Sequence, residues 1–173
     1  MKIEITDLLS IENRTEERQV CTDLTSFVSK LGSFPVTKKE PFLLSLENQE
    51  NKRLLIKGKT AVELSVPCDR CLKEVPVKIR ITIDRELSLE EPESEEREKA
   101  DGFFTGSELD VDSLIYHEIL LNRPMKVLCS ENCKGICRKC GTNLNDKTCS
   151  CDQREPDPRM AAIQDVFQQY KEV

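Results

Sequence analysis

Cysteine is the residue type that could do most chemistry in this sequence of 173 residues, which contains nine of them. Cys21 stands alone, and the other eight fall into two groups. The groups are Cys68-Asp69-Arg70-Cys71 and Cys129-x3-Cys133-x3-Cys137-x2-Cys140-x8-Cys149-x-Cys151. A C-x2-C turn directs two sulfur atoms at one point about 2.3 Å away, and its backbone N–H groups hydrogen-bond to the thiolates. The spacing therefore predicts metal ligation.

Eight thiolates suffice for two tetrahedral zinc sites, each closed by four sulfur ligands and so structural rather than catalytic. The preferred pairing puts Cys137 and Cys140 with Cys149 and Cys151, because this short loop costs little chain entropy to close. The set that remains is Cys68, Cys71, Cys129 and Cys133. The spacing also permits Cys129, Cys133, Cys137 and Cys140 on one ion, and it does not choose between the two arrangements.

Other uses of the cysteines fit the sequence less well. The segment Met1–Asp7 has no apolar stretch of the kind found in secretory signals, so we expect a reducing, cytoplasmic location in which disulfides are rare. No run approaches 18 apolar residues, which predicts no membrane span. A redox C-x2-C normally opens a helix, whereas Cys68 and Cys71 lie between two predicted strands. Iron–sulfur ligation is less common at this spacing. Zinc is preferred, and thiol-redox chemistry is the main alternative.

No catalytic constellation is evident in the sequence. His117 is the only histidine and lies on a predicted helix beside Glu118, without a serine or cysteine partner in a known motif. A P-loop, a G-x-G-x-x-G fingerprint and an H-E-x-x-H motif are all missing. We therefore predict a protein that is not an enzyme, with no catalytic residues and no small-molecule substrate.

The net charge of −6 is concentrated in one segment. Residues 84–101 contain nine acids and three bases, while the rest of the chain is balanced. Residues 52–80 and 123–154 are basic, which is the electrostatic requirement for contact with RNA. Five basic side chains flank the cysteine turns and are the candidate RNA or partner contacts: Arg70, Lys73, Lys134, Arg138 and Lys139.

The sequence has clear signals for a hairpin and a strand before the acidic segment and for two helices after it. Apolar residues alternate from Val75 to Ile83 with Lys78, Arg80 and Thr82 between them, which predicts a half-buried strand. Residues 39–66 are typical of an antiparallel hairpin that Gly58 interrupts. Asp110 is a good cap for a helix that ends before Pro124. Asp157 and Pro158 are placed to begin a last helix.

These elements predict an α+β fold. An antiparallel, partly closed sheet packs against two helices, with a zinc-ribbon-like cysteine-rich insert between the helices. We expect one compact domain with four parts: residues 1–34, a strand and a polar segment without clear assignment; 35–90, the β region with the first cysteine turn; 91–108, an acidic loop; and 109–173, a helix, the zinc-binding segment and the C-terminal helix.

The second half of the chain carries an ordered series of short motifs. It includes Glu118-Ile119-Leu120-Leu121-Asn122-Arg123-Pro124-Met125, Cys133-Lys134-Gly135-Ile136-Cys137-Arg138-Lys139-Cys140-Gly141, Cys149-Ser150-Cys151 and Asp157-Pro158-Arg159. Together with Cys68-Asp69-Arg70-Cys71-Leu72, this series resembles the YceD family of bacterial and plastid proteins. The resemblance covers residues 35–170.

The resemblance implies a role in the accumulation of 23S ribosomal RNA and in assembly of the large ribosomal subunit. The implied partner is ribosomal RNA, a large-subunit ribosomal protein or a precursor particle. The family includes members that lack most of these cysteines, so the shared function is expected to depend on other surfaces, such as Glu118–Met125 and residues 157–159. A transcription-type zinc ribbon that binds nucleic acid is a second alternative.

Overall fold

The protein is described by a computed structural model that covers residues 1–89 and 102–151. Its contacts divide the chain into two compact units. The first unit contains Met1–Cys68 and Lys73–Val127, and the second contains Asp69–Leu72 with the chain from Leu128 onward. The acidic residues 90–101 and the expected helix from Asp157 lie outside the described residues.

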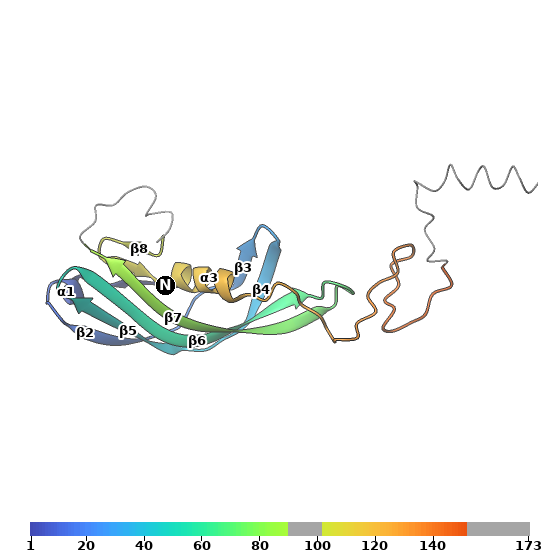
Figure 1. Cartoon of the computed structure of the whole chain (residues 1–173), viewed down its shortest axis with the longest axis horizontal. Helices are drawn as coiled ribbons and strands as arrows, with labels where there is room; N and C mark the ends of the chain where they lie inside the picture. The colour runs from blue at the N-terminus through green and yellow to red at the C-terminus, as the bar shows by residue number, and fades with distance from the viewer. Residues whose placement is uncertain (90–101, 152–173) are drawn as a thin grey trace, which may run out of the picture. The chain divides into compact units, whose positions relative to one another are not determined.

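The first unit contains the helices and strands that Figure 1 labels. In chain order they are β1 (Lys2–Glu4), α1 (Thr6–Leu9), β2 (Thr15–Val20), β3 (Ser26–Ser29), β4 (Gly32–Lys39), β5 (Phe42–Gln49), β6 (Arg53–Pro67), β7 (Glu74–Ser88), β8 (Phe104–Thr105), β9 (Glu108–Asp110) and α3 (Val111–Asn122).

All strand pairs are antiparallel, as the α+β prediction required. The larger sheet has six strands, and the smaller one has the order β1-β9-β8. β6 organises the larger sheet, because its first half pairs with β5, its second half with β4, and its whole length with β7. The β6–β7 register runs from Arg53 opposite Ser88 to Pro67 opposite Glu74. This long hairpin ends at the first cysteine turn.

The predicted alternation in β7 is confirmed. Ile79, Ile81 and Ile83 are buried, while Lys78 and Arg80 are exposed on the opposite face of the strand. Helix α3 packs against β7 and lies over the concave face of the sheet (Figure 1). Fully burying one leucine or isoleucine side chain contributes about 1.5–3 kcal/mol, so this layer supplies the main apolar core of the unit.

Helix α3 begins and ends where the sequence predicts. The carboxylate of Asp110 accepts hydrogen bonds from the backbone N–H groups of Asp112 and Ser113, which would otherwise lack partners. The helix stops at Arg123, whose backbone is extended (ψ 133°) because Pro124 follows it. Within the described residues, no helix is both long and apolar enough to cross a membrane.

Two sequence expectations need correction, and one segment left unassigned gains a structure. Gly58 does not interrupt the hairpin; it lies within β6, where a Cβ atom would come within 3.2 Å of the Leu43 carbonyl oxygen. The polar segment before residue 34, which the sequence leaves without clear assignment, forms β2, β3 and part of β4. β2 lacks an apolar alternation because its backbone pairing with β5 places it at the sheet edge. The end of the expected acidic loop contains β8 and the start of β9.

Candidate metal centre

The eight paired cysteines gather into two sets of four thiols. The sulfur atoms in each set lie within 4.8 Å of one another, and no cysteine is in a disulfide. The first set contains Cys68, Cys71, Cys129 and Cys133, and the second contains Cys137, Cys140, Cys149 and Cys151. This is the grouping that the loop-closure argument favours. Cys21 lies outside both sets.

The turn between β6 and β7 provides two thiols of the first set. The backbone N–H of Cys68 donates to the carbonyl of Lys73 at 2.8 Å, which closes the turn. Leu72 adopts a left-handed φ of 60° within it. The side chain of Cys71 is buried, and its sulfur lies 3.5 Å from that of Cys129. Three of the four thiols belong to the second unit, and Cys68 is the residue immediately before it.

Hydrogen bonds with Arg70, in the first cysteine turn, fix the backbone around Cys133. Nη1 of Arg70 donates to the carbonyl of Cys133 at 2.8 Å, and the N–H of Ile136 donates to the carbonyl of Arg70 at 3.1 Å. Gly135 lies at the closest approach: its φ is +79°, and a Cβ atom there would be 3.0 Å from the Arg70 carbonyl oxygen. Glycine is therefore needed on two counts, conformation and space.

The second set is built on a tight reverse turn. The N–H of Cys137 donates to the carbonyl of Thr142 at 2.8 Å, and the N–H of Gly141 donates back to the carbonyl of Cys137 at 2.9 Å. Gly141 has a φ of +72°, the left-handed conformation expected for a glycine after a C-x2-C turn. Ile136 and Asn143 form an antiparallel bridge beside it. The turn thus points Cys137 and Cys140 at Cys149 and Cys151.

The thiols of the second set influence one another strongly. Hydrogen bonds with the side chain and backbone of Thr142 lower the pKa of Cys140 to about 6. The hydrogen bond with Cys140, together with burial, raises the pKa of Cys151 to about 12. Thiolates this close repel each other, so all four ionise together only when a cation shares the site. The donor set therefore fits Zn²⁺, which four thiolate ligands coordinate tetrahedrally with no open position.

The five candidate contact residues are all exposed. Arg70, Lys134, Arg138 and Lys139 belong to the second unit, and Lys73 belongs to the first. Arg70 also holds the backbone of Cys133 through its guanidinium. Its place in the Cys68–Cys71 motif does not indicate this role. A further residue that sequence reasoning missed is Asn145, whose amide lies 3.3 Å from the sulfur of Cys133.

The Glu118–Met125 segment combines buried and exposed groups. Glu118 is buried and forms an ion pair with Arg85. The guanidinium of Arg123 lies over the ring of Phe34 at 4.9 Å from its centroid. Leu121 and Met125 are exposed. Glu118 and Arg123 therefore stabilise the first unit through these contacts.

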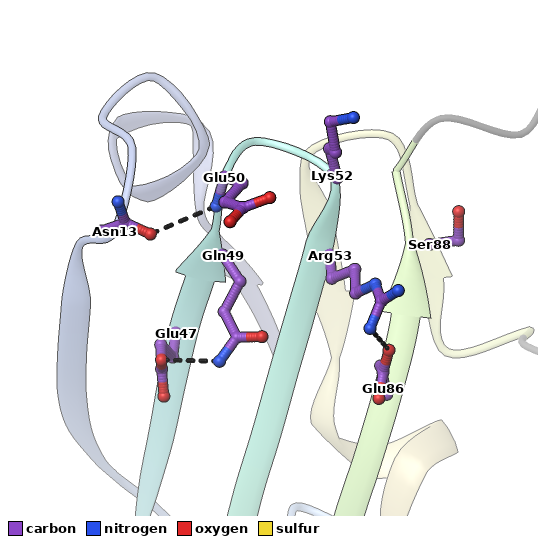
Figure 2. Close-up of a pocket in the computed structure, with 8 residues that line it drawn as sticks. All are labelled: Asn13, Glu47, Gln49, Glu50, Lys52, Arg53, Glu86 and Ser88. Carbon is purple, nitrogen blue, oxygen red and sulfur yellow. Dashed lines mark hydrogen bonds and ion pairs between the residues drawn. The ribbon is translucent and has the colours of Figure 1, made fainter.

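A polar hollow of about 850 Å³ lies at the β5–β6 turn (Figure 2). Several of the polar side chains that line it bind each other. Arg53 forms an ion pair with Glu86 at 3.0 Å, and Gln49 donates a hydrogen bond to Glu47 at 2.9 Å. The hollow is lined by no cysteine or histidine. The ring of His117 instead lies 2.8 Å from the Ser113 carbonyl oxygen on its own helix.

The fold and the two thiol sets define an α+β protein with a sheet-based unit and a cysteine-rich unit. The family model described as large ribosomal RNA subunit accumulation protein YceD matches residues 56–167. That range contains all eight paired cysteines, β7 and α3. The chain belongs to the YceD family.

The chain is also similar to individual known proteins. The chain is 31% identical over 65 residues to the chloroplastic large ribosomal RNA subunit accumulation protein YCED homolog 1 of Arabidopsis thaliana, a match that covers 38% of this chain and only 20% of that protein. It is 21% identical over 178 residues to uncharacterised proteins of Mycobacterium tuberculosis and Mycobacterium bovis, covering 88% of this chain and 86% of theirs. No solved structure matches the chain.

Proposed function

We propose that this protein is a non-enzymatic, cytoplasmic assembly factor of the large ribosomal subunit that binds ribosomal RNA through its cysteine-rich unit. The family description gives the process, large ribosomal RNA subunit accumulation. The Arabidopsis relative carries the same words in its name. Neither states the physical action, which we infer from the surface of the chain.

The observation that carries the proposal is a group of exposed cations on the second unit. Lys134, Arg138 and Lys139 lie within six residues, and none forms an ion pair in the described part of the chain. Exposed cations without an ion-pair partner suit the phosphate backbone of RNA, since contact with it releases condensed counterions. Arg70 adds a fourth positive charge on the same unit.

We propose that each thiol set holds one structural zinc ion, and that zinc supplies the core of the second unit. Among the described residues of that unit, the buried side chains are Cys71, Cys133 and Cys137. The described residues of this unit bury so little apolar surface that they need another source of stability, which metal binding commonly supplies in small domains. The zinc ions would therefore position the basic side chains and take no part in a reaction.

RNA binding across a range of salt concentrations tests this proposal. The variant Lys134→Ala/Arg138→Ala/Lys139→Ala is compared with Lys57→Ala/Lys59→Ala/Arg80→Ala, which removes three exposed cations from the larger sheet. The first variant should bind a 23S rRNA fragment more weakly and lower the salt slope by about 2–3, since each lost phosphate contact removes about 0.7–0.9. The second should bind like the wild type. Equal binding by the first variant and the wild type would contradict the proposal.

A further inference from the structure

The loop between Cys140 and Cys149, two thiols of the second set, contacts the backbone of the segment that follows Cys133, a thiol of the first set. The N–H of Leu144 donates to the carbonyl of Gly135 at 2.9 Å. Asn143 forms a bridge with Ile136. These contacts dock the loop against the segment that follows Cys133, so the conformations of the two sets are not independent.

Asn145, in the same loop, contacts a thiol of the first set directly. Its Nδ2 donates to the sulfur of Cys133 at 3.3 Å and to Oδ1 of Asn143 at 2.8 Å. Its Oδ1 accepts from the backbone N–H of Lys134 at 2.8 Å. Only the oxygen can accept from that N–H, which fixes the orientation of the amide and directs its nitrogen at the sulfur.

Such a contact matters for metal binding. A hydrogen bond to a thiolate stabilises its charge and fixes the direction of its lone pairs, and the loss of an outer partner of this kind typically costs 10–100-fold in metal affinity. Asn145 keeps its position through a loop whose ends are Cys140 and Cys149. When one ion holds both ends, the loop has fewer conformations available.

We propose that metal binding at the second set strengthens metal binding at the first set, and that Asn145 is the positioning residue that couples them. This inference rests on the proposal that both sets bind metal. Linkage requires the coupling to be reciprocal, so an ion in the first set strengthens the second set by the same factor. The chain would then take up its two ions together and lose them together.

The experiment is a titration of the reduced, metal-free full chain with Co²⁺, followed by the absorption of the cobalt–thiolate bonds. Cys149→Ser/Cys151→Ser leaves only the first set intact, and Cys68→Ser/Cys129→Ser leaves only the second. In the wild type, the product of the two association constants should exceed the product measured on the separate sets by about 10–100-fold. Equal products would show that the sets are independent and overturn the inference.

Substitutions of Asn145 test its role. Asn145→Ala should remove most of the excess affinity. Asn145→Asp keeps an acceptor for the Lys134 N–H but replaces the donor to Cys133 with an oxygen, so it should weaken the first set at least as much. Asn132→Ala is the matched control, because Asn132 is exposed between Cys129 and Cys133 and makes no side-chain hydrogen bond in the described structure. It should titrate like the wild type.

Asn145→Ala can also be measured in the variant whose second thiol set is disabled. With the second set disabled, Asn145→Ala should have little additional effect, because the loop no longer holds the amide in place. Full retention of coupling in both Asn145 variants would overturn the role of this residue. Failure of the wild type to bind any Co²⁺ would instead contradict the metal-binding proposal itself, and two ions bound without coupling would contradict only the inference.

Discussion

The guanidinium of Arg85 on β7 donates two hydrogen bonds to Oε1 of Glu118 on α3, at 2.9 Å from Nε and 2.6 Å from Nη2. Arg85 occupies a position on the core-facing side of the strand, between the buried Ile83 and Leu87. Asn122 donates to the second carboxylate oxygen at 3.3 Å. Helix and sheet are therefore joined by a charged contact within an otherwise apolar layer.

We expect Arg85→Met to destabilise the first unit by about 3 kcal/mol, because it leaves the carboxylate of Glu118 buried without its partner. The value lies at the low end for buried pairs since the Arg85 side chain is 37% exposed. Arg85→Met/Glu118→Leu should recover most of the loss. Urea unfolding measures both. Lys78→Met, which breaks the exposed pair with Glu40, is the control and should cost less than about 1 kcal/mol. A similar small loss for Arg85→Met would show that Glu118 does not depend on it.

Asn48 should be important for the position of the N-terminal segment. Its buried amide nitrogen lies within hydrogen-bond distance of the carbonyl oxygens of Leu8, Leu9 and Ile11, at 3.1, 3.3 and 3.0 Å. Asn48→Ala removes the two N–H donors that these carbonyls share, and we expect a loss of about 1–3 kcal/mol in the free energy of unfolding. The neighbouring Gln49→Ala, measured in the same way, should change it much less. Equal losses would mean that the segment is held by other contacts.

The two glycines in the cysteine-rich unit should respond differently to alanine. Both have positive φ, but a Cβ atom at Gly135 would be 3.0 Å from the Arg70 carbonyl oxygen. A Cβ atom at Gly141 would have no heavy atom within 4 Å. Gly141→Ala should therefore carry only the conformational cost, about 1 kcal/mol. Gly135→Ala should in addition displace the Arg70 backbone and weaken Co²⁺ binding at the first set. Equal affinities in the two variants would argue against the close approach.

Metal removal should affect one unit far more than the other. Reduced protein is expected to contain two zinc ions and one accessible thiol, Cys21. After chelation, backbone amide exchange should become fast in residues 128–151 and stay slow in β6 and β7, because the sheet has an apolar core of its own. Protein that contains no metal and several reactive thiols would favour the thiol-redox alternative instead.

The sequence predicts those features that depend on local chemistry. The alternation in β7 and the Asp110 cap need only neighbouring residues. Loop length favours the observed grouping of the cysteines, but the spacing alone also permits another one. The features it does not predict are non-local. β2 is a strand because β5 pairs with it, and Gly58 is explained by the approach of Leu43.

The same reason explains why part of the candidate site was missed. The link from Arg70 to Cys133 joins residues 63 positions apart, and no pattern near either of them indicates it. Asn145 lies in a polar loop whose composition is typical of any turn. Its contact with Cys133 becomes visible only once the loop folds back on the first set.

We propose above that this protein acts on the large ribosomal subunit through its cysteine-rich unit. The most direct test is co-sedimentation of the tagged full chain with large-subunit precursor particles from growing cells, comparing the wild type with Lys134→Ala/Arg138→Ala/Lys139→Ala. The wild type should migrate with the precursors, and the variant, with unchanged zinc content, should be largely lost from them. A wild-type chain found only at the top of the gradient, or a variant that sediments like the wild type, would contradict it.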